Sequence, residues 1–141
     1  MLKLTSRRWT AFVSIFSLLL CGSLSAQSST YYVDSEHGKD SNNGLKVGSA
    51  WNSLSQINST SFRPGDTISF KAGCFWHGIL MPKGSGAVNR PIVINSYGAG
   101  KKPIIVGDGG VAAVMLRNQD WWEISNLDVS NDASDEGLRR G

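Results

Sequence analysis

The stretch NRPIVINSYGAGKKPIIVGDGG, residues 89–110, decides the fold. It contains two short β-branched runs, at 92–94 and 104–106, and each follows a proline and runs on toward glycine. β-Branched residues favour strands. Proline is tolerated at the first position of a strand, where it loses no ladder hydrogen bond. The stretch therefore predicts short strands that start at a proline corner and end at a glycine-rich turn.

Short runs of the same kind recur along the rest of the chain, at 67–70, 78–81, 113–116 and 122–130. Two interleaved series share a spacing in the low twenties. One series passes through positions 68, 92 and 114, and the other through 79, 104 and 127. Repeats of this length are typical of solenoids, in which each repeat buries its apolar face against the next. A β-sandwich is the alternative, but it would not naturally keep two series in step.

The segment at 30–66, which comes before these runs, has a mixed pattern of one strand, one turn-rich stretch and one helix. Residues 30–33 (TYYV) predict a strand, and the turn-rich stretch 34–44 follows it. One amphipathic helix is expected next, capped by Ser49, with Trp51, Leu54 and Ile57 on its buried face. This helix should end before the proline-led turn at 63–66.

Residues 1–26 have the pattern of a secretory signal peptide. Lys3, Arg7 and Arg8 precede an apolar run at 11–20, and small residues follow at 22–26. The apolar run is shorter than the roughly 20 residues of a membrane span. We therefore expect cleavage after Ala26, a secreted or otherwise extracytoplasmic protein in the periplasm or outside the cell, and no stable membrane span after cleavage.

The charge of the chain belongs to this leader. The formal net charge is +3. Lys3, Arg7 and Arg8 supply that excess, and the first 26 residues contain no acid, so the remainder is neutral. Nucleic-acid binding requires a clustered basic face, and we expect no nucleic-acid partner. Cys74 is the one cysteine after residue 26, which excludes an internal disulfide.

Several short motifs follow one another in a recognisable order. They are YYVD at 31–34, GxDxNxG at 38–44, WxxL at 51–54, PGDTIxF at 64–70, RPIxI at 90–94 and WxIxNL at 122–127. This order resembles the N-terminal part of secreted right-handed parallel β-helix proteins of the pectate-lyase-like superfamily. That superfamily includes bacterial polysaccharide lyases and glycoside hydrolases.

The resemblance implies an all-β fold, a right-handed parallel β-helix with its N-terminal cap and the first two or three coils. It divides the chain into the signal peptide at 1–26, the cap at 27–65 and incomplete coils at 66–141. We expect a fragment that lacks the catalytic coils, is inactive alone and associates with itself through its open C-terminal coil. The implied function of the complete protein is degradation of an extracellular polysaccharide, as a lyase or hydrolase. A non-catalytic glycan-binding or cell-surface structural module is the alternative.

Candidate site residues are few, and no catalytic residue can be assigned. Trp76, His77 and Trp121 are candidates for contact with a sugar, because an exposed aromatic ring can stack on a pyranose. Trp121 is preferred to Trp122, since neighbours in a strand point to opposite faces. The alternative role for each tryptophan is core packing.

A calcium ion is the one cofactor that the sequence suggests. Asp34, Asp40 and Asn42 gather hard oxygen donors in one short loop, and Ca²⁺ prefers such ligands. The alternative is that these side chains close turns through hydrogen bonds to the backbone.

Overall fold

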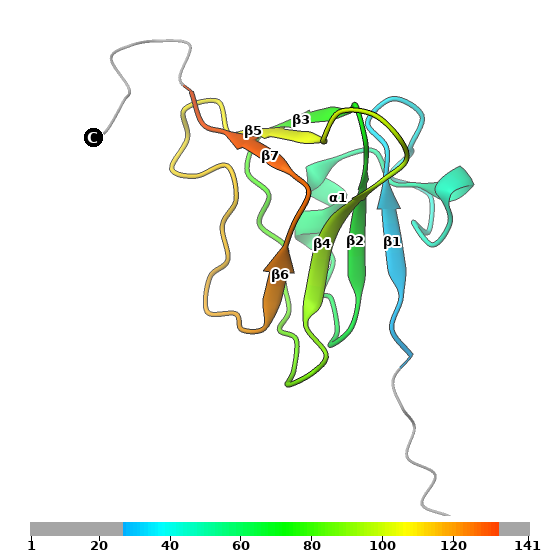
Figure 1. The fold of residues 1–141 in the computed structure, drawn as a ribbon, viewed down its shortest axis with the longest axis vertical. Helices are drawn as coiled ribbons and strands as arrows, with labels where there is room; N and C mark the ends of the chain where they lie inside the picture. The colour runs from blue at the N-terminus through cyan, green and yellow to red at the C-terminus, as the bar shows by residue number, and fades with distance from the viewer. Residues whose placement is uncertain (1–26, 133–141) are drawn as a thin grey trace, which may run out of the picture.

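The computed structural model describes residues 27–132, which form seven short strands, one α-helix and one 3-10 turn (Figure 1). The predicted signal peptide lies outside the described residues. The elements in chain order are β1 Thr30–Val33, η1 Val47–Ser49, α1 Leu54–Ser59, β2 Thr67–Lys71, β3 Phe75–His77, β4 Ile92–Tyr97, β5 Ile104–Val106, β6 Trp122–Ile124 and β7 Asp128–Ser130. No helix within 27–132 is long and apolar enough to cross a membrane.

The strands form two parallel sheets. One has the order β1-β2-β4-β6 and the other the order β3-β5-β7. Figure 1 shows β1, β2 and β4 side by side, with the three-stranded sheet lying across one end of them. Because consecutive strands alternate between the sheets after β2, neighbours within a sheet are joined by crossover connections, as parallel pairing requires.

In-register rows of apolar residues link the strands to the core. Ile68 of β2 pairs with Ile94 of β4, and Ile94 pairs with Ile124 of β6. In the other sheet, Trp76 pairs with Ile105. Ile68, Ile94, Trp76 and Ile105 are buried, so these rows face the core, and Ile124 extends the first row at its exposed edge. The β-branched residues of the quoted stretch therefore supply the buried side of both sheets.

Aromatic rings and α1 close the core between the two sheets. Phe70 and Trp76 meet edge to face, with ring centroids 4.9 Å apart. Leu54 and Ile57 of α1 are buried against the same cluster. The Tyr31 ring stacks on a tryptophan of the loop before α1. Hydrophobic burial, at about 25 cal/mol per Å² of apolar surface, is the main stabilising contribution here.

The right-handed parallel β-helix expected from the sequence is wrong for this structure. A solenoid stacks complete coils, and every side of one coil repeats in the next. The described residues instead form two small parallel sheets, with one α-helix, one 3-10 turn and no clear solenoid. Residues 78–81 and 113–116, expected as strands of successive coils, meet only through an isolated bridge between Leu80 and Val114. The spacing predicted parallel pairing of successive strands, but it predicted neither the partners of residues 78–81 and 113–116 nor the absence of closed coils.

Three local expectations are also corrected. The two series are paired differently, because β3 lies at 75–77 and not at 78–81. The expected strand at 122–130 is divided into β6 and β7 around Asn126, whose φ is 54°. The helix begins later than expected, because Ser53 caps it and accepts a hydrogen bond from the Gln56 backbone N–H at 3.3 Å. Trp51 belongs to the loop before it.

A buried carboxylate fixes the start of β1 to the turn before β2. One oxygen of Asp66 accepts a hydrogen bond from the Ser29 backbone N–H, and the other accepts one from the Arg63 N–H, both at 2.8 Å. Gly65 in this turn has a φ of 91°, which glycine adopts without strain. The PGD motif is therefore a structural turn that holds the first strand against the second.

Candidate functional site

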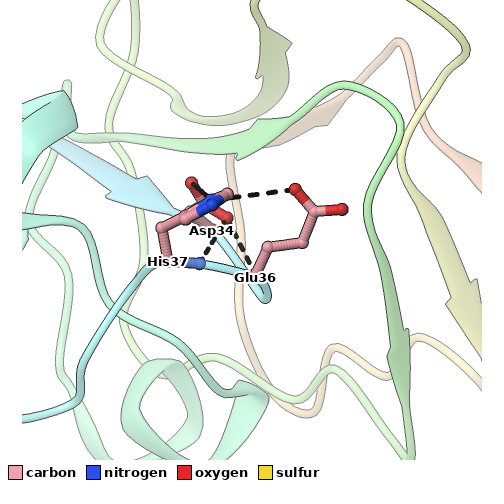
Figure 2. Close-up of side chains that lie close together, drawn as sticks. All are labelled: Asp34, Glu36 and His37. Atoms are coloured by element: carbon pink, nitrogen blue, oxygen red, sulfur yellow. Dashed lines mark hydrogen bonds and ion pairs between the residues drawn. The ribbon is translucent and has the colours of Figure 1, made fainter.

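Charged side chains gather where β1 ends. Figure 2 shows Asp34, Glu36 and His37 close together on the turn after β1. Lys71, from the end of β2, reaches into this group. Its Nζ lies 2.9 Å from Asp34 Oδ2, 3.3 Å from Glu36 Oε2 and 3.2 Å from His37 Nδ1. The cluster therefore joins the first two strands of the larger sheet.

The Asp34 carboxylate is buried and fully partnered. Its Oδ1 accepts hydrogen bonds from the backbone N–H groups of Glu36 at 2.9 Å and His37 at 3.0 Å. Burial raises the pKa of Asp34. The hydrogen bonds from Lys71 and from the two backbone N–H groups lower it by a larger amount. The net result is a pKa below the ordinary value, so Asp34 is ionised at neutral pH. The same contact raises the pKa of Lys71.

This arrangement fits a structural ion pair better than an acid–base pair. Hydrolysis of a glycosidic bond commonly uses two carboxyl groups, one of them with a raised pKa that lets it donate a proton. The pKa of Asp34 is shifted in the opposite direction. Lys71 also lies within reach of both carboxylates. We therefore assign the cluster to structure and not to proton transfer.

The contacts of Lys71 also concern the predicted calcium site, because they involve Asp34. Ligand atoms of Asp34, Glu36 and His37 lie within 4.8 Å of one another. The Lys71 ammonium group already supplies a positive charge there, and a bound cation would have to displace it. Asp34 therefore has a partner that serves in place of a metal ion.

Asp40 and Asn42 use their polar atoms in local hydrogen bonds. Asp40 accepts from the backbone N–H groups of Asn52 and Ser53 at 2.9 Å, and from the Ser53 hydroxyl at 2.6 Å. Burial raises the pKa of Asp40, and these bonds lower it more, with a net fall. Asn42 Nδ2 donates to the Ala50 carbonyl at 2.9 Å. The geometry favours the turn-closing alternative, and a calcium site at Asp34, Asp40 and Asn42 stays a prediction.

The two tryptophan candidates lie in different environments. Trp76 is only 4% exposed, and its indole N–H donates to the Asn52 carbonyl at 2.8 Å. Its ring faces the core, which agrees with the alternative role of core packing. Trp121 is exposed, and its φ is 60°, an uncommon value for a bulky residue. Its carbonyl accepts a hydrogen bond from the Ile92 N–H.

His77 lies on the outward side of β3, next to the exposed ring of Phe75. Phe75 and His77 flank the inward-facing Trp76 in β3, so both point outward. Phe75 is 58% exposed, and its ring meets His77 edge to face at 5.6 Å. His77 Nδ1 lies 2.7 Å from Asp108 Oδ1. Alternation in the triplet FWH could have identified Phe75, but nothing local to His77 identifies Asp108.

We call this surface the outer face. Its members are the outward residues of the three-stranded sheet: Phe75 and His77 of β3, Ile104 and Val106 of β5, and Asp128 and Ser130 of β7. Cross-strand neighbours on one face lie about 5 Å apart, so the six side chains form one continuous surface. Asp108 adds a carboxylate at its edge. The outer face combines an exposed aromatic ring with hydrogen-bonding groups.

Comparisons with known proteins relate the chain to glycan-degrading enzymes. No family model matches it. A lacto-N-biosidase from Bifidobacterium longum subsp. longum is 26% identical over an alignment of 138 positions, and the match covers 78% of this chain and 9% of that protein. The crystal structures of GH136 lacto-N-biosidase from Eubacterium ramulus match with TM-scores of 0.69 for the selenomethionine derivative and 0.67 for the native protein. Their identities are 28% and 27%, and each match covers 77% of this chain and 21% of the other.

The chain thus spans about a tenth of the curated relative and about a fifth of the solved structures. It is a partial homologue of a glycoside hydrolase. The expectation of a glycan-degrading relative is confirmed in this broad form. The pectate-lyase-like superfamily, which the motif order resembled, is not confirmed.

Proposed function

We propose that the protein to which these residues belong hydrolyses glycosidic bonds in an extracellular glycan. The observation that carries this proposal is the likeness to solved lacto-N-biosidases, at 28% identity and a TM-score of 0.69. Both the curated relative and the solved structures bear the same enzyme name, so hydrolysis is favoured over the lyase reaction. A lacto-N-bioside is the first substrate to test.

Within this function, residues 27–132 contribute scaffold and glycan contact. The Asp34–Lys71 ion pair does not fit proton transfer, because the pKa of Asp34 is lowered. We therefore do not assign the acid, or the nucleophile or base, to this ion pair. The secretory leader proposed for residues 1–26 would deliver the protein to the compartment in which such glycans occur. Mass measurement of the exported protein would show whether its N-terminus is Gln27.

A turnover assay tests the proposed reaction. The chain and the complete open reading frame that contains it are incubated with p-nitrophenyl lacto-N-bioside, and the released p-nitrophenol is followed. We expect turnover by the complete frame and none by the 141-residue chain. A panel of other aryl glycosides and an unsaturated-uronate assay at 235 nm serve as comparators. Eliminative cleavage, or no cleavage of any glycoside by the complete frame, would overturn the hydrolase proposal.

A non-catalytic glycan-binding role is the second candidate, and the exposed ring of Phe75 favours it. An exposed aromatic side chain provides a large apolar surface, which a soluble protein commonly uses for recognition. Saturable binding of lacto-N-biose without turnover by the complete frame would select this role. Turnover by the complete frame would select the hydrolase.

We also propose that the chain associates with a second copy of itself through the edges of its two sheets. Ile94 and Ile105 are fully buried, whereas Ile124 and Val129, their partners in β6 and β7, are 42% and 51% exposed. β6 and β7 are the last strands of their sheets within the described residues. Unpaired apolar edges favour pairing with another chain. We propose that a second copy pairs there, which sedimentation velocity over a range of protein concentrations would detect as a dimer.

A further inference from the structure

The outer face has features that no part of the scaffold requires. The Phe75 ring is more than half exposed, although it lies one position from the buried Trp76. His77 and Asp108 are also exposed, yet they contact each other at 2.7 Å. A core role explains neither the ring nor the pair. We propose that the outer face binds a neutral oligosaccharide, with one sugar ring on Phe75 and its hydroxyl groups on the His77–Asp108 pair.

The local backbone positions Asp108 for this role. Asp108 and Gly109 have φ values of 52° and 72°, and the Gly110 N–H donates to the Gly107 carbonyl at 2.9 Å. Two successive residues with positive φ define a type I′ turn, for which Asp-Gly is a preferred sequence. The turn directs the carboxylate back over β3. Asp108 Oδ1 contacts one imidazole nitrogen, and its second oxygen has no hydrogen bond among those found within residues 27–132.

The pairing of ring and polar groups matches the chemistry of a sugar. One face of a pyranose carries C–H groups, which pack on an aromatic ring, while its rim carries hydroxyl groups that both donate and accept. Carboxylate oxygens accept from hydroxyl groups, and the free imidazole nitrogen can donate or accept. Ligand sites commonly combine apolar contact surface with a few oriented polar groups. Ile104 extends the apolar part of the surface next to Phe75.

The charges on this surface select against acidic glycans. Asp108 lies at one side, and Asp128, in the row of Phe75 and Ile104, lies at the other. Lys102 Nζ is 3.9 Å from Asp128 Oδ1, so that lysine is already paired. A uronate carboxylate would meet the Asp108 carboxylate, which has no lysine or arginine partner among the ion pairs of the described residues, and like charges repel. The expected ligand is therefore a neutral sugar, which deepens the proposed function and rests on it.

Nuclear magnetic resonance on the ¹⁵N-labelled chain tests this inference. The probes are lacto-N-biose, the disaccharide in the relatives' name, and trigalacturonate as an acidic comparator. We expect saturable shifts of the Phe75, His77 and Val106 amides with lacto-N-biose, and none with trigalacturonate at the same concentration. Equal binding of the acidic probe, shifts centred on Trp121, or no shift at all would overturn the inference.

Matched variants identify the groups that bind. Phe75→Ala should weaken binding about tenfold, since the ring supplies most of the contact, whereas Phe75→Tyr should stay within about twofold. Val88→Ala removes an equally exposed apolar side chain from the turn before β4, and it should leave binding unchanged. Asp108→Asn keeps a residue that tolerates the left-handed φ and removes the charge. We expect a loss of about threefold, with an unchanged fold, because a neutral amide is a weaker acceptor.

Two readouts separate this inference from the proposed function. The complete open reading frame with Phe75→Ala is assayed for turnover beside the wild type. Wild-type turnover with binding lost in Phe75→Ala supports both statements. Turnover without binding at the outer face overturns the inference and leaves the hydrolase proposal standing. Binding at the outer face without turnover supports the inference and overturns the hydrolase proposal. The absence of both binding and turnover overturns both statements. Amide shifts that depend on protein concentration without sugar would assign the outer face to self-association and overturn the inference.

Discussion

Asp34→Ala is the most informative stability variant, because this buried carboxylate contacts Lys71 and two backbone N–H groups. The change removes the ion pair with Lys71 at 2.9 Å and the acceptor for the backbone N–H groups of Glu36 and His37. It leaves an ammonium group and two N–H groups without their partner. The variant should therefore show whether the cluster after β1 stabilises the fold.

The expected magnitude follows from these contacts. A hydrogen bond to a charged group contributes about 1.5–3 kcal/mol, and breaking a buried ion pair by removing one partner costs about 3–5 kcal/mol. Lys71 is 29% exposed and can recover part of its hydration, which places the loss near the lower limit. We expect Asp34→Ala to lower the free energy of unfolding by about 3 kcal/mol. Asp34→Asn should cost about half as much, because its amide oxygen still accepts from the backbone.

Urea unfolding followed by tryptophan fluorescence at pH 7 measures these losses. Glu36→Gln is the matched control, since Glu36 contacts the same ammonium at 3.3 Å from an exposed position. Exposed pairs contribute about 0–1 kcal/mol, so the control should change stability by less than about 0.5 kcal/mol. A loss below about 1 kcal/mol in Asp34→Ala, or equal losses in both variants, would refute the reasoning.

The pH dependence gives a second test of the same carboxylate. The pKa of Asp34 in the folded chain lies below its ordinary value of 3.8. A lowered carboxyl pKa means that folding favours the ionised form, so this stabilisation is complete above pH 3.8 and disappears as the pH falls through the folded value. The stability difference between wild type and Asp34→Asn should therefore shrink in acid. A difference that persists unchanged to pH 2 would contradict this assignment.

Four further variants test other parts of the structure. Gly38→Ala places a Cβ against the carbonyl of Trp51 and should cost about 3 kcal/mol in urea unfolding, whereas Gly48→Ala, whose Cβ meets open space, should cost less than about 1 kcal/mol. Trp76→Phe loses the indole hydrogen bond to the loop before α1 and should lower stability by about 1–2 kcal/mol in the same assay. Ile124→Lys places a charge on the exposed edge of β6 and should raise the dissociation constant of any dimer seen by sedimentation at least about fivefold. An unchanged dissociation constant would exclude this edge as the dimer interface.

The sequence predicted individual strands better than it predicted how they combine. The strands at 30–33 and 104–106 have the expected bounds, because β-branched and aromatic residues with turn residues on each side describe a strand locally. The β-helix was wrong, because periodic spacing indicates that strands repeat but cannot show which residues pair or whether the loops between strands close into coils. The break at Asn126 was missed, since a left-handed asparagine looks like any other polar residue in a strand pattern.

The sequence identified residue types for the candidate site better than it identified their contacts. His77 and Trp121 are exposed in the structure, but Trp121 lies before β6 with a φ of 60°, so its exposure does not follow from strand alternation. The oxygen cluster of Asp34 and Asp40 was visible in the sequence, but its internal partners were not. Lys71, which pairs with Asp34, lies 37 positions away, and only the parallel pairing of β1 and β2 brings it near.

The hydrogen bond between Ser29 and Asp66 limits how far the N-terminus can be shortened. Ser29 donates its N–H to a buried carboxylate, and its carbonyl accepts from Thr67 at 2.8 Å. A new terminus at Gln27 preserves both bonds. A protease that trims past Ser29 would leave Asp66 with one empty oxygen and remove the residue that aligns β1 with β2. Under the proposed cleavage after Ala26, a protease could therefore remove only two residues, Gln27 and Ser28, before the bonds that align β1 with β2 are lost.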